Sequence, residues 1–188
     1  MKTISWDSIP DPGDRPLRKT RSYLDARSAA VAYIGICRKT TGRVRVQLLR
    51  KGHPDEMAGL VVSDLVEEGI LDDMAFGQAL IRSRTGAGTE SILSMRSRML
   101  RLGLDSRVIE ILLAESPPPD DVDSLLALLR KKYARDLTAS GKIPADAPPG
   151  LAARMMRFLC GRGFPYERVR ETVTAMTDIR LRGDLDDI

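Results

Sequence analysis

The sequence predicts an all-α protein made of three tandem three-helix repeats. Hydrophobic residues make up 43% of the 188 residues and charged residues 30%, which is typical of a folded chain. Aromatic residues account for only 4%, fewer than β-sandwiches and barrels usually contain, so the composition favours helices. Apolar positions recur at helical spacing between breaks that contain glycine or proline.

A recurring glycine is the main sign of the repeat. Gly52, Gly103 and Gly163 each end an expected helix, and each is followed two residues later by a helix start. Apolar residues lie six and ten positions beyond each glycine, a spacing that places both on one helix face. These residues are Ala58, Val62, Ile109, Leu113, Val169 and Val173. Because a repeat of this size has a thin core, we expect neighbouring repeats to lean on one another.

The first repeat is expected at residues 24–70, after a flexible leader at 1–23 that is rich in proline and charge. Its first helix begins near Leu24 and ends near Lys39, where Thr-Thr-Gly breaks the apolar pattern. Its second helix carries the apolar residues of 44–49 and stops at the first of the three glycines. A proline suited to the first turn begins the third helix, which runs to Gly69.

The second repeat, at 71–117, has three capped helices and ends in a run of three prolines, which stops a helix. The expected caps and ends are Asp72 and Arg84, Thr89 and Gly103, and Asp105 and Ser116.

The third repeat, at 121–182, contains a loop at 138–150 that is rich in proline, alanine and glycine. Its helices are expected at 122–136, 151–161 and 165–182, before an acidic tail at 183–188.

Charge is segregated along the chain. Residues 1–52 contain 12 basic and 4 acidic side chains, whereas residues 53–73 contain 7 acidic side chains and no Lys or Arg. A basic segment attracts phosphates or an acidic protein surface, although a solvated helix face gives the same pattern.

Little in the sequence supports catalysis, a cofactor or a metal. His53, the single histidine, lies between a helix end and a helix start, and the adjacent pair Asp72 and Asp73 suits a cap and a first turn. Cys37 is expected as a small buried helix residue, and two cysteines are too few for a disulfide framework or a zinc site. We therefore expect a protein that is not an enzyme, has no cofactor, and works in a reducing cytoplasm. No apolar run has the length of a membrane span, and the first 20 residues lack a secretory signal.

Basic residues are the candidate partner-binding groups. Arg predominates over Lys, and its guanidinium binds carboxylates and phosphates in a bidentate manner. The alternative for many of these positions is that a cation near a helix C-terminus complements the helix dipole. The candidates are Arg43, Arg45, Arg50, Lys51, Arg82, Arg84, Arg96, Arg98, Arg101, Lys131, Lys132, Arg157 and Arg162.

Several short motifs, taken in order, resemble the RecX family of regulatory proteins. They are Glu-Glu-Gly-Ile-Leu-Asp-Asp-Met-Ala-Phe at 67–76, Ile-Arg-Ser-Arg at 81–84, Lys-Lys-Tyr at 131–133, Arg-Phe-Leu at 157–159 and Arg-Gly-Phe at 162–164. Each motif alone is weak, but the combination and its order are specific. The resemblance covers about residues 28–178 and includes the layout of three repeats.

The resemblance implies an elongated, curved helical array that binds RecA recombinase filaments on DNA. Such a regulator inhibits strand exchange, ATP hydrolysis and co-protease activity by groove binding or end capping, and so acts in homologous recombination, DNA repair and the SOS response. The implied partners are the RecA filament and DNA, the latter bound weakly and without sequence specificity, with no membrane and a monomeric chain. Some residues that match the family pattern are expected to have structural roles in turns or in the core. They are Gly69, Leu71, Phe76, Tyr133 and Phe164.

The sequence departs from the family pattern at the start of the second helix. The usual Ser-x-x-Glu-Leu is replaced by Gly-Arg-Val-Arg-Val-Gln-Leu at 42–48, so the acidic residue is missing, and the 138–150 loop is long. A stand-alone helical DNA-binding protein that uses the same basic helices is the alternative reading. Tight, salt-sensitive binding to bare DNA would distinguish it from a filament regulator.

Overall fold

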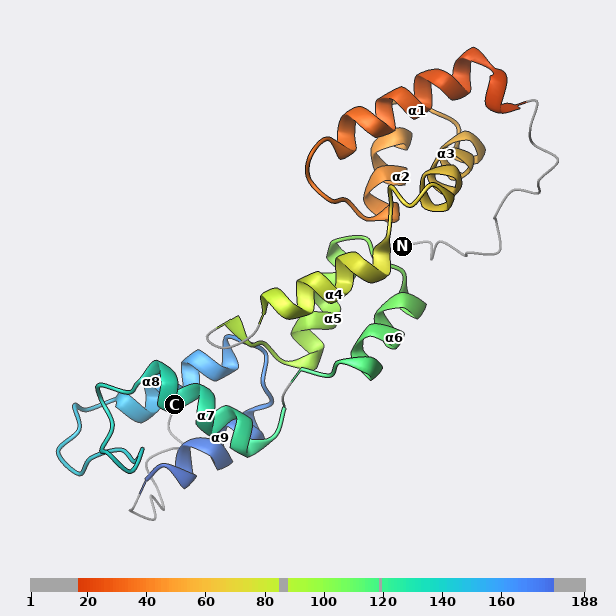
Figure 1. Ribbon diagram of the computed structural model, residues 1–188. Helices are drawn as coiled ribbons and strands as arrows, with labels where there is room; N and C mark the ends of the chain where they lie inside the picture. The colour runs from red at the N-terminus through yellow and green to blue at the C-terminus, as the bar shows by residue number, and fades with distance from the viewer. Residues whose placement is uncertain (1–16, 85–87, 119, 178–188) are drawn as a thin grey trace. The chain divides into compact units, whose positions relative to one another are not determined.

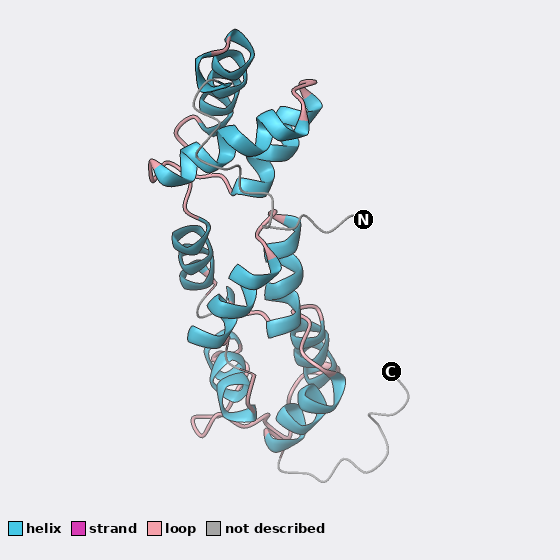
Figure 2. Cartoon of the chain, turned by 90° about the vertical axis from the view of Figure 1, so that its right-hand side faces the viewer, coloured by secondary structure: helices cyan, strands magenta, loops and turns pink. Residues whose placement is uncertain are grey.

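The computed structural model describes residues 17–84, 88–118 and 120–177, and within these ranges it contains helices and no strand (Figures 1 and 2). This confirms the all-α prediction. The elements are a 3-10 helix, η3 (Leu17–Lys19), and α1 (Arg21–Ile34), α2 (Thr41–Arg50), α3 (Asp55–Glu67), α4 (Asp73–Ser83), α5 (Ile92–Arg101), α6 (Ser106–Glu115), α7 (Val122–Lys132), α8 (Leu151–Cys160) and α9 (Tyr166–Ala175).

The chain forms two compact units. One comprises residues up to Leu80 together with Arg98–Ala114, and the other comprises Ile81–Ser97 together with residues from Glu115 onward. Both α4 and α5 therefore contribute to each unit. The division into three repeats at 24–70, 71–117 and 121–182 stays a prediction.

The first unit is built around the packing of α1, α2 and α3. Thr40, in extended conformation, caps α2 by accepting a hydrogen bond from the amide of Arg43 at 3.3 Å. Leu48 and Leu65, one from each of α2 and α3, are completely buried in the core. Gly77 of α4 lies so close to α6 that a Cβ atom there would stand only 2.2 Å from the side chain of Leu112.

A buried carboxylate ties the start of α4 to the start of α2. Asp73 accepts hydrogen bonds from the amide and the hydroxyl of Thr41, at 2.9 and 2.7 Å. Burial raises the pKa of Asp73 above its ordinary value, and the bonds from Thr41 oppose that rise. The second of the adjacent acidic residues thus serves the fold, while the first, Asp72, caps α4 through the amide of Ala75, as predicted.

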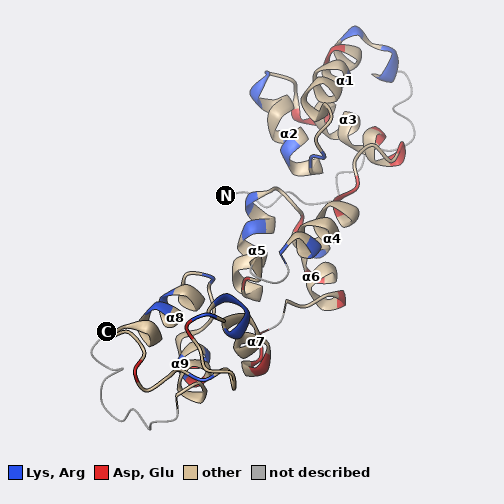
Figure 3. Cartoon of the chain, turned by 60° about the vertical axis from the view of Figure 1, so that its left-hand side comes forward, with Lys and Arg blue, Asp and Glu red and all other residues tan. Residues whose placement is uncertain are grey.

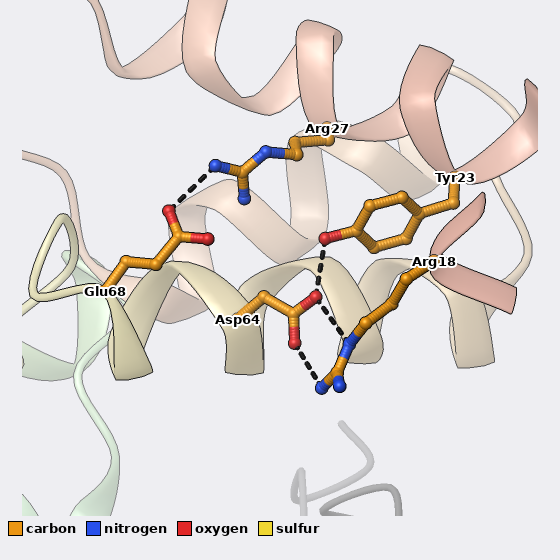
Figure 4. Close-up of polar contacts among 5 residues, drawn as sticks. All are labelled: Arg18, Tyr23, Arg27, Asp64 and Glu68. Carbon is orange, nitrogen blue, oxygen red and sulfur yellow. Dashed lines mark hydrogen bonds and ion pairs between the residues drawn. The ribbon is translucent and has the colours of Figure 1, made fainter. Parts of the chain in front are cut away.

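The structure departs from the expected leader at its last residues. Regular structure begins at η3 and α1 rather than near Leu24, because Arg18 forms a bidentate ion pair with Asp64 of α3 at 2.6 and 3.0 Å (Figure 4). The hydroxyl of Tyr23 donates to the same carboxylate at 2.5 Å, and Arg27 pairs with Glu68 at 2.7 Å. Residues 1–16 of the predicted leader and the whole tail at 183–188 lie outside the described residues.

The second unit packs α7, α8 and α9 around a leucine- and methionine-rich core. Asp121 caps α7 by accepting from the amide of Ser124 at 2.8 Å, and Leu129, Met155 and Leu159 are completely buried. The predicted loop at 138–150 is held to α9 by the amide of Ile143, which donates to the Met176 carbonyl at 2.9 Å.

Several expected helix ends are wrong. The first helix stops at Ile34, where Gly35 adopts a φ of +53°, so Cys37 lies beyond the helix and is exposed rather than buried. Ser91 caps α5 in place of Thr89, by accepting from the amide of Ser94 at 3.2 Å. The seventh helix ends at Lys132 rather than Asp136. The last expected helix ends earlier within the described residues, and positions 178–182 lie outside them.

Candidate partner-binding surface

Two of the candidate arginines on α2 are engaged within the first unit. Arg45 holds Asp55 of α3 in a bidentate ion pair at 3.0 and 2.8 Å, and this pairing lowers the pKa of Asp55 below its ordinary value. The guanidinium of Arg43 donates to the carbonyl of Arg101 at 3.1 Å, which brings α2 and the end of α5 together. Both side chains therefore make contacts within the unit.

The last turn of α2 leaves its cations in solvent. Arg50 and Lys51 are exposed, as is Arg101 at the end of α5. No ion pair of these three side chains is found among the described residues. They are accessible to a partner, and they also complement the dipoles of the helices that they end.

The candidates at the end of α4 and along α5 are more enclosed. Arg82 is exposed, whereas Arg84, Arg96 and Arg98 are half-buried. Arg82, Arg96 and Arg98 each take part in an interaction within the chain. Replacing these side chains would therefore change the fold's own contacts as well as any contact with a partner.

The second unit brings two candidate cations together on one aromatic ring. The Lys132 ammonium lies 4.7 Å from the centroid of Phe158, and the Arg162 guanidinium lies 4.5 Å from it. Tyr133 meets the same ring edge-on at 6.1 Å and donates from its hydroxyl to the Arg154 carbonyl at 3.3 Å. Cations this close to an aromatic face gain cation–π energy, so the cluster is held in a defined arrangement.

This cluster lies in a strongly basic part of the chain. Residues 130–162 contain eight Lys or Arg and two Asp, a net charge of +6, and α8 carries no acidic residue (Figure 3). Lys131 and Arg157, on the helices that form the cluster, are exposed. Fixed cations interleaved with aromatic rings can bind phosphates, carboxylates or nucleic-acid bases.

Phe158 is the contributor that sequence reasoning missed. It lies in the motif at 157–159 and was not among the candidates, which were all Lys or Arg. The cation-rich end of α7 was visible in the sequence. The end of α7 lies beside Phe158 because Leu129 of α7 packs into the same core as α8, and no pattern of neighbouring residues in the sequence indicates that packing.

The structure places the single histidine, His53, in the turn between α2 and α3. His53 is half-buried, and its amide donates to the Leu48 carbonyl at 3.2 Å in the turn after α2. Within the described ranges, no three His, Cys, Asp or Glu side chains gather closely enough to hold a metal ion. In the same part of the chain, no helix has the length and apolar character required to cross a membrane.

These features define an all-helical protein with basic surfaces. Comparison with known proteins finds relatives by both sequence and fold. A RecX regulatory protein of Mycolicibacterium vanbaalenii is 24% identical over 175 residues, covering 93% of this chain and 94% of the relative. That of Halorhodospira halophila is 27% identical over 157 residues, covering 84% and 91%. That of Geobacillus kaustophilus is 28% identical over 142 residues, which is 76% of this chain and 50% of the longer relative. No family model matches the sequence.

The fold agrees with these sequence matches. The crystal structure of RecX from Lactobacillus salivarius superposes with a TM-score of 0.58 at 14% identity, covering 82% of this chain and 96% of that one. A second crystal structure of a regulatory protein RecX gives a TM-score of 0.54 at 16% identity, covering 82% and 72%. Sequence and fold together support this chain as a RecX family protein, as its motifs predicted.

Proposed function

We propose that this chain binds RecA recombinase filaments on DNA and inhibits their strand exchange, ATP hydrolysis and co-protease activity. The relatives are named regulatory proteins, which favours regulation through binding rather than catalysis. The observation that carries the proposal is the cluster in which Lys132 and Arg162 converge on Phe158, inside a stretch of net charge +6.

The cluster suits a filament because a filament presents acidic protein surface and phosphates together. Arg and Lys bind both, and their contacts with the Phe158 ring restrain Lys132 and Arg162, which reduces the entropy lost on binding. A chain that presents basic residues from several helices can contact more than one protomer, which gives avidity. Bridging protomers would oppose the movements that accompany ATP turnover, and binding at an end would block filament growth.

The same cluster also favours the second candidate, a stand-alone DNA-binding protein. Cations and aromatic side chains together are typical of surfaces that bind single-stranded nucleic acid. The two functions differ in what they require. A DNA-binding protein binds bare DNA tightly with steep salt dependence, whereas a filament regulator acts on RecA at concentrations that leave bare DNA uncoated.

A charge-reversal pair tests the proposed surface. We expect Lys131→Glu with Arg157→Glu to raise the concentration for half-maximal inhibition of RecA ATP hydrolysis by about tenfold or more, because both exposed cations then repel the filament. These residues give a cleaner test than Arg96 and Arg98 of α5, which interact within the chain. The matched control is Arg107→Glu with Arg168→Glu, which changes charge equally on α6 and α9.

The control is expected to inhibit like the wild type, and all proteins should share one circular dichroism spectrum. Equal inhibition by the two charge-reversed proteins would exclude the surface at α7 and α8. Weakened binding to bare DNA together with an absence of RecA inhibition by the wild type would favour the stand-alone DNA-binding protein.

A further inference from the structure

The first unit contains a close joint between the start of α2 and the turn after α5. The Thr40 hydroxyl, which caps α2, donates to the Leu102 carbonyl at 2.6 Å. Gly103 follows in the left-handed region, with φ at +83°. A Cβ atom there would lie 3.1 Å from the amide nitrogen of Arg43, and one on Gly42 would lie 2.3 Å from the Gly103 carbonyl oxygen. The joint requires glycine on both sides.

The second unit contains a joint of the same kind between the start of α5 and the turn after α8. The amide of Ser91, the residue that caps α5, donates to the Arg162 carbonyl at 3.0 Å. Gly163 has a φ of +81°, and a Cβ atom there would lie 2.9 Å from the Ser91 hydroxyl and 2.0 Å from that of Ser94. A helix start capped by a small hydroxyl residue again covers a glycine turn, and the residue before the glycine again supplies the carbonyl.

A third turn has the same backbone and is open. The amide of Gly52 donates to the Leu49 carbonyl at 3.0 Å, as Gly103 and Gly163 donate to the carbonyls three residues before them at 2.9 and 2.8 Å. Gly52 shares their left-handed conformation, with φ at +85°. Among the described residues, nothing lies within 4 Å of the position that its Cβ would take. The turn after α2 therefore has the form of half a joint.

We propose that this open turn, residues 50–53, docks a helix start of the partner protein that carries a Ser or Thr cap. The two filled joints define the chemistry of the occupant: a small hydroxyl residue that donates from its hydroxyl or its amide to the Lys51 carbonyl, with backbone or small hydroxyl side chains close to the glycine. Arg50 and Lys51 of this turn are exposed, so acidic residues in the first turn of the partner helix complete the match. The identity of the partner as the recombinase rests on the proposed function.

A second copy of this chain does not supply the occupant. The helix start that corresponds to those of α2 and α5 is that of α8, and its cap position is Gly150, which offers no side chain and has a φ of +83°. Gly150 therefore lacks the side-chain hydroxyl that the cap residues of both filled joints carry. It also lacks the extended conformation that Thr40 adopts.

The test adds a side chain to the open turn without straining it. Asn adopts the left-handed conformation more readily than other side-chain residues, so Gly52→Asn fills the docking space and keeps the turn. Gly69→Asn is the matched control, because Gly69 also ends a helix, has a φ of +71° and has nothing within 4 Å among the described residues. We expect Gly52→Asn to raise the half-inhibitory concentration on RecA ATP hydrolysis at least tenfold, and Gly69→Asn to stay within twofold of the wild type.

The outcomes separate the docking site from the function. If the wild type and both variants inhibit RecA equally, the proposed docking site is wrong and the proposed function is unaffected. No inhibition by the wild type overturns both. Sedimentation tests for self-association. If the wild type self-associates with rising concentration and only Gly52→Asn loses that behaviour, a second copy is the occupant and the proposal is overturned. If Gly52→Asn unfolds, Lys51→Glu, which leaves the backbone of the turn unchanged, must weaken inhibition for the proposal to stand.

Discussion

Replacing Tyr23 with Phe removes the hydroxyl that donates to the Asp64 carboxylate, which joins α1 and α3 (Figure 4). The side chains involved are almost wholly enclosed, with Tyr23 5% exposed and Asp64 6% exposed. The tyrosine hydroxyl donates to Asp64 at 2.5 Å, and Arg18 donates to both oxygens of the same carboxylate. The ring of Phe keeps the packing of Tyr, so the change removes only the hydroxyl and its contacts.

The size of the effect follows from what remains bonded. A hydrogen bond to a charged group contributes about 1.5–3 kcal/mol to stability. Asp64 keeps its two bonds from Arg18, so its charge stays partnered, and we expect the low end of that range, about 1.5 kcal/mol. For a chain of this length, such a loss lowers the melting temperature by roughly 3–6 °C.

Urea unfolding followed by circular dichroism measures the loss, and a double-mutant cycle with Asp64→Asn assigns it. In the Asp64→Asn background the hydroxyl meets a neutral amide, so the predicted cost of Tyr23→Phe falls to about 1 kcal/mol or less. A cost below about 0.5 kcal/mol in the wild-type background would refute the claim that this bond to a charged group stabilises the first unit.

The pH dependence gives an independent check on the same bond. Burial raises the pKa of Tyr23 above its usual value near 10, and the bond to the Asp64 carboxylate adds to the rise. A raised pKa means that the unfolded state loses the proton first, so the stability from Tyr23 is complete below pH 10 and is lost as the pH rises through the folded-state value. Stability curves of the wild type and Tyr23→Phe should therefore converge at alkaline pH.

Two further substitutions test other buried contacts. Asp73→Asn should match or exceed wild-type stability at pH 7 and show less pH dependence. Burial raises the pKa of Asp73, so its ionisation opposes folding as the pH rises through that value. Asp73→Ala should lose about 1–3 kcal/mol of stability, since it leaves the buried amide of Thr41 without a partner. Urea titrations at pH 4 and pH 7 measure both, and a less stable Asn variant at pH 7 would contradict the assignment. Gly77→Ala should destabilise by about 1–3 kcal/mol, because its Cβ meets the buried Leu112, whereas Gly59→Ala in α3, with nothing within 4 Å among the described residues, should stabilise by about 0.5–1 kcal/mol. Equal thermal shifts for the two alanine variants would count against the close approach of α4 and α6.

The helical character of the chain could be predicted because its signals are local. Caps such as Asp72 and Asp121 bond amides three residues away, so sequence neighbours are enough to place a helix start. The recurring glycines were equally visible, since each must adopt a left-handed conformation that other residues avoid. The ends of helices were less certain, as Gly35 shows, because a helix can stop wherever packing no longer supports it.

The parts that could not be predicted depend on contacts between residues far apart in the sequence. Arg18 was assigned to a leader because nothing near it shows that Asp64, 46 residues later, would bind it. Arg45 was a candidate for partner binding, but Asp55 of the next helix engages it. Charge alone does not separate a cation that binds a partner from one that holds two helices together, and the difference lies in the tertiary pairing.

The decisive measurement for the proposed function is ATP hydrolysis by RecA on single-stranded DNA, titrated with this protein. Binding of the protein to the same DNA without RecA is measured alongside. We expect inhibition at concentrations well below those that coat the bare DNA, and a loss of that inhibition in Lys131→Glu with Arg157→Glu. Tight binding to bare DNA with no inhibition of RecA would contradict the proposed function.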